Sequence, residues 1–229
     1  MENFVLLLGG HVFRGIMEGD LSNVRKVSSV VRELVNEGIK IAIVTGGSEV
    51  ARRYIEAVRE VGGDNYTQDY AGILATRLHA VIMISALGAL AYPKVVESYE
   101  EAAIAVSMGK IPISGGIQPG QSTDAVASLI AEKLGFGLMV KMTGVDGVYD
   151  RDPKEYPDAR KIEELTYDDL EHIVMDKPYH PGRYELLDAL SIKILRRSSI
   201  STIILSGDKP EALLELVRGK KVGSIIRPG

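Results

Sequence analysis

Val5-Leu6-Leu7-Leu8-Gly9-Gly10 is the first of three short apolar runs in this chain that end in a pair of glycines. The second covers Ile39 to Val44 and continues as Thr45-Gly46-Gly47, and the third is Ile111-Pro112-Ile113-Ser114-Gly115-Gly116. A short continuous apolar run is typical of a strand buried on both faces, and such strands occur mainly in parallel sheets. The three runs therefore predict a parallel sheet whose strands lead into glycine turns.

A helical pattern follows each of the three runs. Between Asp20 and Gly38, apolar residues recur at helical spacing, with Asp20 or Ser22 as N-cap and Gly38 after the last turn. The other elements expected are helices over Glu49 to Val61, Ala71 to Leu87, Asp124 to Leu134, Tyr184 to Arg197 and Lys209 to Val217, strands over Gly137 to Met142 and Ser201 to Leu205, and a hairpin or flap over Tyr149 to Tyr167. This alternation predicts an α/β fold with helices on both faces of the sheet.

The composition narrows the class of protein. Of the 229 residues, 45% are hydrophobic and 25% charged, which suits a soluble protein of one large domain or two closely packed lobes. The chain has no cysteine, which excludes disulfides, thiolate metal sites and a cysteine nucleophile and fits a reducing cytoplasm. A net charge of −4 without a basic stripe argues against nucleic-acid binding, and the N-terminal apolar run is too short for a signal segment or a membrane span.

The glycine pairs predict where a ligand binds. In open parallel sheets the binding site lies beyond the carboxyl ends of the strands, where the three pairs are expected. Glycine lets backbone N–H groups converge on one point without an obstructing side chain, and the N-terminus of a following helix adds partial positive charge. This combination is typical of a polyphosphate site, although the sequence contains neither a Walker P-loop nor a Gly-x-Gly-x-x-Gly after a strand.

Several polar side chains near these turns have two possible roles each, one structural and one functional. Ser122 and Asp124 are either helix caps or parts of an anion-binding loop in which Asp124 orients cations around a transferring phosphate. Arg52 is either a surface arginine or a phosphate ligand, and Asp69 either caps the next helix or accepts hydrogen bonds from a ribose. The four histidines (His11, His79, His172 and His180) lack metal-ligand spacing, so no metal ligand is assigned to the protein.

Taken together, these segments resemble a known family. Thr45-Gly46-Gly47-Ser48 with Ala51-Arg52, Asp69-Tyr70-Ala71-Gly72, Gly115 to Asp124, and Thr143 to Tyr149 with Asp152-Pro153 resemble the uridylate kinases of the amino acid kinase superfamily, most closely the archaeal branch. Tyr184-Glu185-Leu186-Leu187-Asp188 also resembles that branch. The match runs in the right order over almost the whole chain.

The resemblance implies a fold, an activity and an assembly. The fold is a three-layer α/β/α sandwich with a mainly parallel central sheet in a single domain, with an acceptor-binding lobe over about residues 1–135 and an ATP-binding lobe over about 136–229. The activity is transfer of the γ-phosphoryl group of ATP to UMP, with Mg²⁺, in pyrimidine nucleotide synthesis in the cytoplasm. The assembly is a homohexamer built as a trimer of dimers.

The resemblance also implies roles for individual residues. ATP contacts fall at Gly10, His11, Ser48, Arg52, Thr143, Gly144, Tyr149 and Asp152. UMP contacts fall at Gly47, Asp69 and the loop formed by Ile117, Gln118, Pro119, Gly120, Gln121, Ser122 and Thr123. The catalytic residues are Asp124, Arg52 and Lys141.

The sequence also departs from the family pattern. Many members carry a lysine on the first strand, where this chain is apolar around Leu7. His11, Ser48, Glu49 and Gly144 also differ from the residues common at their positions. We hypothesise that Lys141, which resembles a lysine of the bacterial branch, supplies the missing charge; the alternative is a surface lysine at a strand end.

Two other functions remain open from the sequence. An isopentenyl phosphate kinase shares the fold, but the histidine typical of that group is absent from Gly47-Ser48-Glu49-Val50-Ala51-Arg52. Kinases that act on carboxylates usually carry the first-strand lysine and fit less well. A non-catalytic nucleotide-binding protein is compatible with the apolar first strand, whereas the presence of Arg52, Asp69 and Asp124 together favours an enzyme.

Overall fold

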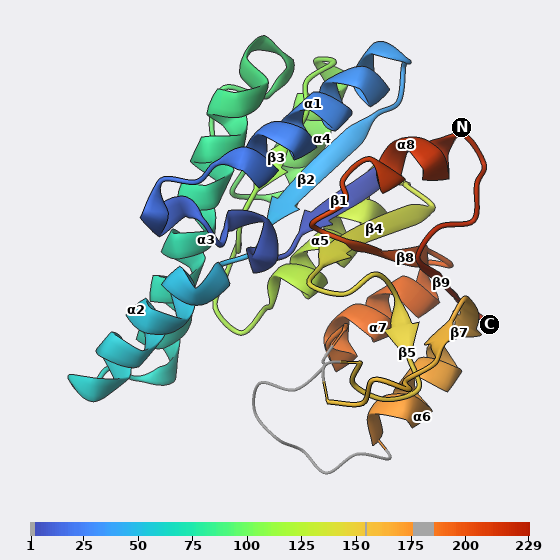
Figure 1. Cartoon of the computed structure of the whole chain (residues 1–229). Helices are drawn as coiled ribbons and strands as arrows, with labels where there is room; N and C mark the ends of the chain where they lie inside the picture. Colours follow the sequence, from blue (N-terminus) through green and yellow to red (C-terminus); the bar gives the residue numbers. More distant parts are fainter. Residues whose placement is uncertain (1–2, 154, 176–185) are drawn as a thin grey trace.

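Residues 3–153, 155–175 and 186–229 are described in the structure, which is a computed structural model. A seven-stranded sheet in the order β3-β2-β1-β4-β8-β9-β7 runs through the molecule, with helices on both faces (Figure 1). The strands are β1 (Phe4–Leu8), β2 (Ile41–Thr45), β3 (Ile113–Ser114), β4 (Leu138–Thr143), β7 (Glu164–Thr166), β8 (Ser201–Ser206) and β9 (Ser224–Arg227). β3, β2, β1, β4 and β8 are parallel, β9 is antiparallel to β8, and β7 is parallel to β9. The predicted fold class is confirmed.

The two faces of the sheet carry separate hydrophobic cores. Side chains alternate along a strand, so Leu6 and Leu8 of β1 face one core while Val5 and Leu7 face the other. The helices are α1 (Ser22–Asn36), α2 (Ser48–Glu60), α3 (Asn65–Leu87), α4 (Tyr99–Ser107), α5 (Thr123–Leu134), α6 (Tyr167–Met175), α7 (Ala189–Arg197) and α8 (Ala212–Val217). Residues of α1, α3 and α8 enter the first core, and residues of α4, α5, α6 and α7 enter the second. β1 is therefore buried on both faces, as its continuous apolar run predicts.

Helix α3 corrects one prediction. It begins at Asn65, because the carboxylate of Asp64 accepts hydrogen bonds from both the backbone N–H and the hydroxyl of Thr67. Asp69 therefore lies inside the helix and is not its cap. Together with the short turn that follows it, this helical stretch (Asn65–Leu90) is long and apolar enough to span a membrane. The core helix of a soluble protein passes the same test, so this is weak evidence for a membrane segment.

Several other elements differ from the expectation. α7 begins at Ala189 with Asp188 as N-cap, whereas the predicted helix began at Tyr184; residues 184 and 185, like His180, lie outside the described residues. α8 begins at Ala212 instead of Lys209. The predicted hairpin is confirmed as β5 (Val148–Tyr149) paired with β6 (Lys161–Ile162). The elements α4, α6, β7 and β9 were not predicted.

Candidate active site

The three glycine turns follow β1, β2 and β3, which are neighbouring parallel strands of the sheet. The backbone N–H of Gly9 donates to Met142 O at 2.9 Å, and that of Gly46 donates to Leu8 O at 2.8 Å. On the other side of β4, Gly207 N donates to Thr143 O at 2.7 Å. These bonds tie the ends of β2, β1, β4 and β8 into one continuous surface of backbone groups.

Gly10 allows the first two turns to touch. A Cβ atom placed on Gly10 would lie 2.3 Å from Ser48 Cα and 2.4 Å from Ser48 N. Ser48 itself begins α2 with a φ of 54°, which is uncommon for a residue other than glycine. The ATP contacts implied at Gly10 and Ser48 and the UMP contact implied at Gly47 are therefore adjacent, because the two backbones meet without an intervening side chain.

The two arginines at the start of α2 have different surroundings. Arg53 forms an ion pair with Glu49 at 2.6 Å, and both side chains are exposed. Arg52 is exposed and forms no hydrogen bond or ion pair within the described part of the chain. Of the two, Arg52 is the one whose guanidinium group remains available to a phosphate.

Helix α3 anchors the loop that was predicted to bind UMP. The Asp69 carboxylate accepts a hydrogen bond from Gly120 N at 2.8 Å, and Gly120 has a φ of +80°. Arg77 donates to Gly116 O at 3.1 Å and to Ile117 O at 3.2 Å, while Glu97 pairs with the same guanidinium at 2.6 Å. At the far end of the loop, Tyr99 OH donates to Gln121 Oε1 at 2.8 Å. The loop is held at three points by α3 and α4.

Arg77 was not predicted from the sequence. The signal available was its position as the single charged residue in the apolar stretch from Ala71 to Leu87. A charge in such a stretch is seldom buried without partners. Its partners here are two carbonyl groups of a loop that lies 39 and 40 residues further along the chain, at Gly116 and Ile117.

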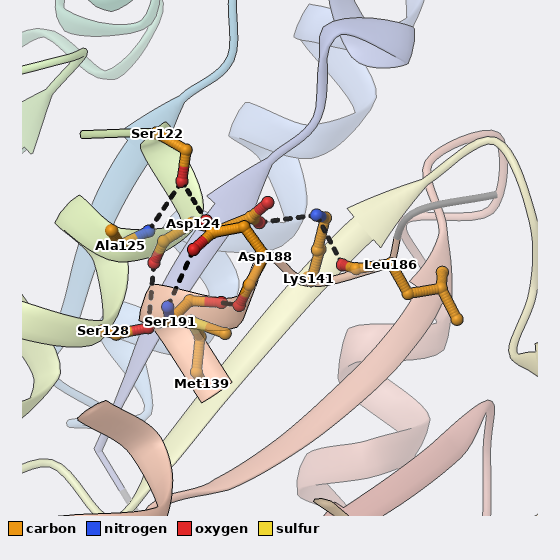
Figure 2. Close-up of polar contacts among 9 residues, drawn as sticks. All are labelled: Ser122, Asp124, Ala125, Ser128, Met139, Lys141, Leu186, Asp188 and Ser191. Atoms are coloured by element: carbon orange, nitrogen blue, oxygen red, sulfur yellow. Dashed lines mark hydrogen bonds and ion pairs between the residues drawn. The ribbon is translucent and has the colours of Figure 1, made fainter. Parts of the chain in front are cut away.

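Asp124 and Lys141 form an ion pair at the centre of the site (Figure 2). Lys141 Nζ lies 2.5 Å from Asp124 Oδ1 and donates to Leu186 O at 2.7 Å. The two side chains are 12% and 17% exposed, which excludes the alternative of a surface lysine. Burial raises the pKa of the Asp124 carboxyl, and the ammonium of Lys141 opposes that rise. The pair is shielded from water, so each charge depends on the other.

The register of the sheet places Lys141 next to the apolar position of the first strand. On β4, Lys141 is the direct partner of Leu7 on β1, so both side chains leave the same face of the sheet. That is the face covered by α5, the helix that carries Asp124. The Lys141 side chain therefore leaves the sheet on the same face as Leu7, towards the helix that carries Asp124.

The N-terminal cap of α5 is Ser122. Ser122 Oγ accepts a hydrogen bond from Ala125 N at 3.0 Å, and Asp124 makes no cap contact because it faces Lys141. The Ser122 hydroxyl also donates to Asp188, whose carboxylate accepts from Ser191 N at 2.9 Å at the start of α7 (Figure 2). Asp188 was not predicted as a site residue. Its signal was that of a helix cap, which does not distinguish it from other caps.

A cavity of about 310 Å³ lies at the ends of β4 and β8. Its walls are Gly144, Val145, Asp146, Tyr149, Pro153, Ser206 and Lys209. Tyr149 OH donates to Asp146 Oδ1 at 2.7 Å, which raises the pKa of Tyr149 to about 12. Of the predicted ATP contacts, Gly144 and Tyr149 line this cavity. Thr143 directly precedes Gly144, and its carbonyl accepts a hydrogen bond from Gly207 N. The carbonyl of Asp152 accepts hydrogen bonds from the backbone N–H groups of Glu155 and Tyr156 in the next turn.

His11 links the first turn to the loop after β8. His11 Nε2 lies 2.6 Å from Asp208 Oδ1, and the ring packs against Gly144 and Gly207. Cβ atoms at those glycines would lie 3.5 Å from His11 Nδ1 and 3.3 Å from His11 Cδ2. Among residues 3–153, 155–175 and 186–229, no group of three or more histidine or acidic side chains could hold a metal ion.

Comparison with known proteins assigns the chain to a family. Residues 4–206 match the model of the amino acid kinase family, and the chain belongs to this family. It is 46% identical to the uridylate kinase of Pyrobaculum calidifontis over 222 residues, which cover 97% of this chain and 98% of the relative. It is 41% identical to the uridylate kinase of Thermococcus kodakarensis over 204 residues, covering 88% and 91%. The crystal structure of the uridylate kinase from Archaeoglobus fulgidus superimposes with a TM-score of 0.84 at 34% identity, covering 99% of this chain and 100% of that one. The resemblance seen in the sequence is confirmed.

Proposed function

We infer that this chain phosphorylates UMP, transferring the γ-phosphoryl group of ATP to give UDP and ADP. The observation that carries this inference is the convergence of the glycine turns, the anchored loop and the Asp124–Lys141 pair at one edge of the sheet, in a chain similar to uridylate kinases along nearly its full length. The Archaeoglobus fulgidus structure, at 34% identity, supports the same reading.

The proposed mechanism is direct in-line transfer without a covalent intermediate. Backbone N–H groups at Gly10 and Gly47 and the guanidinium of Arg52 bind phosphate oxygens. Lys141 neutralises charge on the transferring group while Asp124 holds its ammonium in place. Magnesium bound to the nucleotide would supply further positive charge to the phosphate groups. Catalysis then rests on positioning and on electrostatic stabilisation of the transition state.

The two substrates are assigned to the two halves of the sheet. In this proposal, residues up to about 135 form the acceptor lobe and bind UMP through Gly47, Asp69 and the loop from Ile117 to Thr123. Residues from about 136 form the ATP lobe, with the nucleoside in the cavity beside Tyr149. Support comes from the position of the Asp124–Lys141 pair, since Asp124 lies on the last helix of the first lobe and Lys141 on the first strand of the second.

A coupled assay of ADP release tests the inference. ATP and Mg²⁺ are supplied with UMP, CMP, AMP, isopentenyl phosphate or acetylglutamate in turn. Turnover that is confined to UMP, or strongly prefers it, is the expected result. Turnover with another acceptor would be consistent with the proposed ATP site but would reject UMP as the acceptor. Calorimetric binding of UMP and ATP without ADP formation would favour a non-catalytic nucleotide-binding protein.

Asp69 is expected to matter for UMP and not for ATP. The variant Asp69→Ala removes the acceptor that fixes Gly120 N, so the loop loses one anchor and the ribose loses its proposed partner. We expect the KM for UMP to rise roughly 10- to 100-fold, the range for a hydrogen bond to a charged group, with the KM for ATP changed less than about twofold. Asp69→Asn keeps an oxygen acceptor, so its KM for UMP should lie between those of the wild type and of Asp69→Ala.

Glu60→Gln provides the control for Asp69, since Glu60 is an exposed carboxylate at the end of α2. It should behave as the wild type. Equal effects of Asp69→Ala on both KM values would reject the assignment of Asp69 to the UMP site.

The outer face of α3 supports the proposed homohexamer. Tyr66, Tyr70, Leu74, Leu78 and Val81 recur every three or four residues and are 66%, 47%, 44%, 60% and 49% exposed. An apolar stripe of this length on one helix is typical of a protein–protein interface. We propose that a second copy of this chain covers it within each dimer of the hexamer.

Light scattering coupled to size-exclusion chromatography measures the assembly. A hexamer is expected for the wild type, and Leu78→Glu should yield smaller species because it places a charge in the apolar stripe. Leu190→Glu is the matched control, since Leu190 is an exposed leucine on α7. A monomeric wild type, or no change with Leu78→Glu, would contradict the proposal.

A further inference from the structure

The loop between β8 and α8 forms one wall of the nucleotide cavity. Gly207 N donates to Thr143 O at 2.7 Å, which fixes the loop beside the end of β4. Within the loop, Lys209 N donates to Ser206 O at 3.3 Å and Asp208 N donates to Ser206 Oγ at 3.2 Å. Ser206 and Lys209 thereby face the cavity opposite Gly144 and Val145, the turn that follows β4. Neither residue belongs to the site set that the sequence predicted.

Two lysines around the site are already paired with carboxylates, whereas Arg52, at the start of α2, forms no ion pair or hydrogen bond among the described residues. Lys141 pairs with Asp124 at 2.5 Å, and Lys161 pairs with Asp146 at 3.3 Å on the cavity wall. The ring of His11 is held by Asp208 at 2.6 Å. Within the described parts of the chain, Lys209 is the cavity-lining cation whose side chain makes no ion pair or hydrogen bond.

A nucleoside triphosphate brings several negative charges to this edge of the sheet. The first strand offers no cation, because Leu7 is buried and apolar. Backbone N–H groups supply partial charges, and the ammonium of Lys141 is shared with Asp124. An exposed lysine on a flexible stem can exchange water for phosphate oxygens at little cost to the free protein.

We propose that Lys209 binds the phosphate chain of the phosphoryl donor and adds a positive charge that is not shared with a carboxylate. This proposal rests on the proposed function, since it takes the occupant of the cavity to be a nucleoside triphosphate. Lys209 would then be a binding residue for the donor, fixed at the rim of the cavity by the tight turn from Ser206.

The test compares Lys209→Met and Lys209→Arg with a control lysine. Lys40 is suitable because it is exposed, forms no ion pair among the described residues, and directly precedes β2 at the opposite edge of the sheet. Initial rates are measured across ATP concentrations at saturating UMP, and across UMP concentrations at saturating ATP. Binding of ADP and of adenosine is measured in parallel by calorimetry or by competition with a fluorescent nucleotide.

Lys209→Met should raise the KM for ATP and the Kd for ADP about tenfold, the scale of one hydrogen bond to a charged group. The Kd for adenosine should be unchanged, because adenosine carries no phosphate. Lys209→Arg should recover most of the ADP affinity, and Lys40→Met should match the wild type.

Three results would overturn the proposal. These are an unchanged Kd for ADP in Lys209→Met, an equal loss of adenosine binding, and a rise confined to the KM for UMP. The binding measurements need no turnover. A wild type that binds ADP but fails to phosphorylate UMP would therefore reject the proposed function while still testing Lys209.

Discussion

Lys141→Ala is expected to lower turnover at saturating ATP and UMP by roughly 10²- to 10³-fold, the scale of losing one preorganised electrostatic group in an active site. Lys141 Nζ lies on the same sheet face as Leu7 and is held by Asp124 and Leu186 O. Nothing on the first strand can replace its charge. The measurement is the steady-state rate of ADP release, with protein concentration corrected for the folded fraction.

The same substitution is also expected to destabilise the protein, which must be separated from catalysis. It leaves the part-buried Asp124 carboxylate without its partner, and breaking a buried pair costs about 3–5 kcal/mol in the free energy of unfolding, less where water reaches the group. The double variant Lys141→Met with Asp124→Asn removes both charges. We expect it to recover much of the stability in urea unfolding and none of the turnover.

Lys193→Met is the control for Lys141, because Lys193 is exposed on α7. Unchanged turnover in Lys141→Ala would reject the catalytic role of Lys141. Recovery of turnover in the double variant would show that the pair is structural, and that the loss in the single variant came from an unpaired charge.

Gly10→Ala is expected to have the second large effect. The added methyl group would lie 2.3 Å from Ser48 Cα, and backbone atoms cannot turn aside as a flexible side chain can. The two turns must separate, which costs roughly 1–3 kcal/mol in the free energy of unfolding or somewhat more. Separation also moves the N–H groups proposed to bind ATP phosphates, so the KM for ATP should rise about tenfold or more.

Gly137→Ala is the matched control for Gly10. No atom lies within 4 Å of a Cβ built on Gly137, and its φ is not in the left-handed region. Urea unfolding and steady-state kinetics on both variants separate a specific clash from the general effect of an added methyl group. Equal behaviour of the two variants would contradict the proposed contact between the first two turns.

The strands and their glycine turns could be predicted because their information is local. β1 and β2 are continuous apolar runs because both faces of each strand are buried. Their predicted ends lie within two residues of the ends in the structure. α5 was placed within one residue because Gly135, in the left-handed conformation, ends it and apolar residues recur at helical spacing. The short strands β7 and β9 were missed, since strands of three and four residues carry little periodic signal.

The candidate site was only partly predictable, and the reason is the order of the strands. Neighbours in the sheet are distant in the chain, as where β4 and β8 meet, so groups at their ends come together only on folding. The contacts of Asp69 with Gly120, of Arg77 with Ile117 and of His11 with Asp208 span 51, 40 and 197 residues. A pattern of neighbouring residues cannot predict contacts between residues this far apart in the chain. Resemblance to a family supplied the positions of Asp69 and Lys141, but the partners of their side chains came from the structure.

The amino-acid sequence alone thus specified a parallel sheet with three glycine turns at one edge. A strand that is buried on both faces is a continuous apolar run, and a turn whose backbone must be free of side chains contains glycine, so both features are visible in consecutive residues. Tertiary packing alone determined which residues from distant segments are in contact. It set Lys141 beside Leu7 through the register of β1 and β4, made Asp124 the partner of that lysine, and brought Lys209 to the cavity at the ends of β4 and β8. Register and loop contact depend on which distant segments pack together, and that is decided by the free energy of the whole fold.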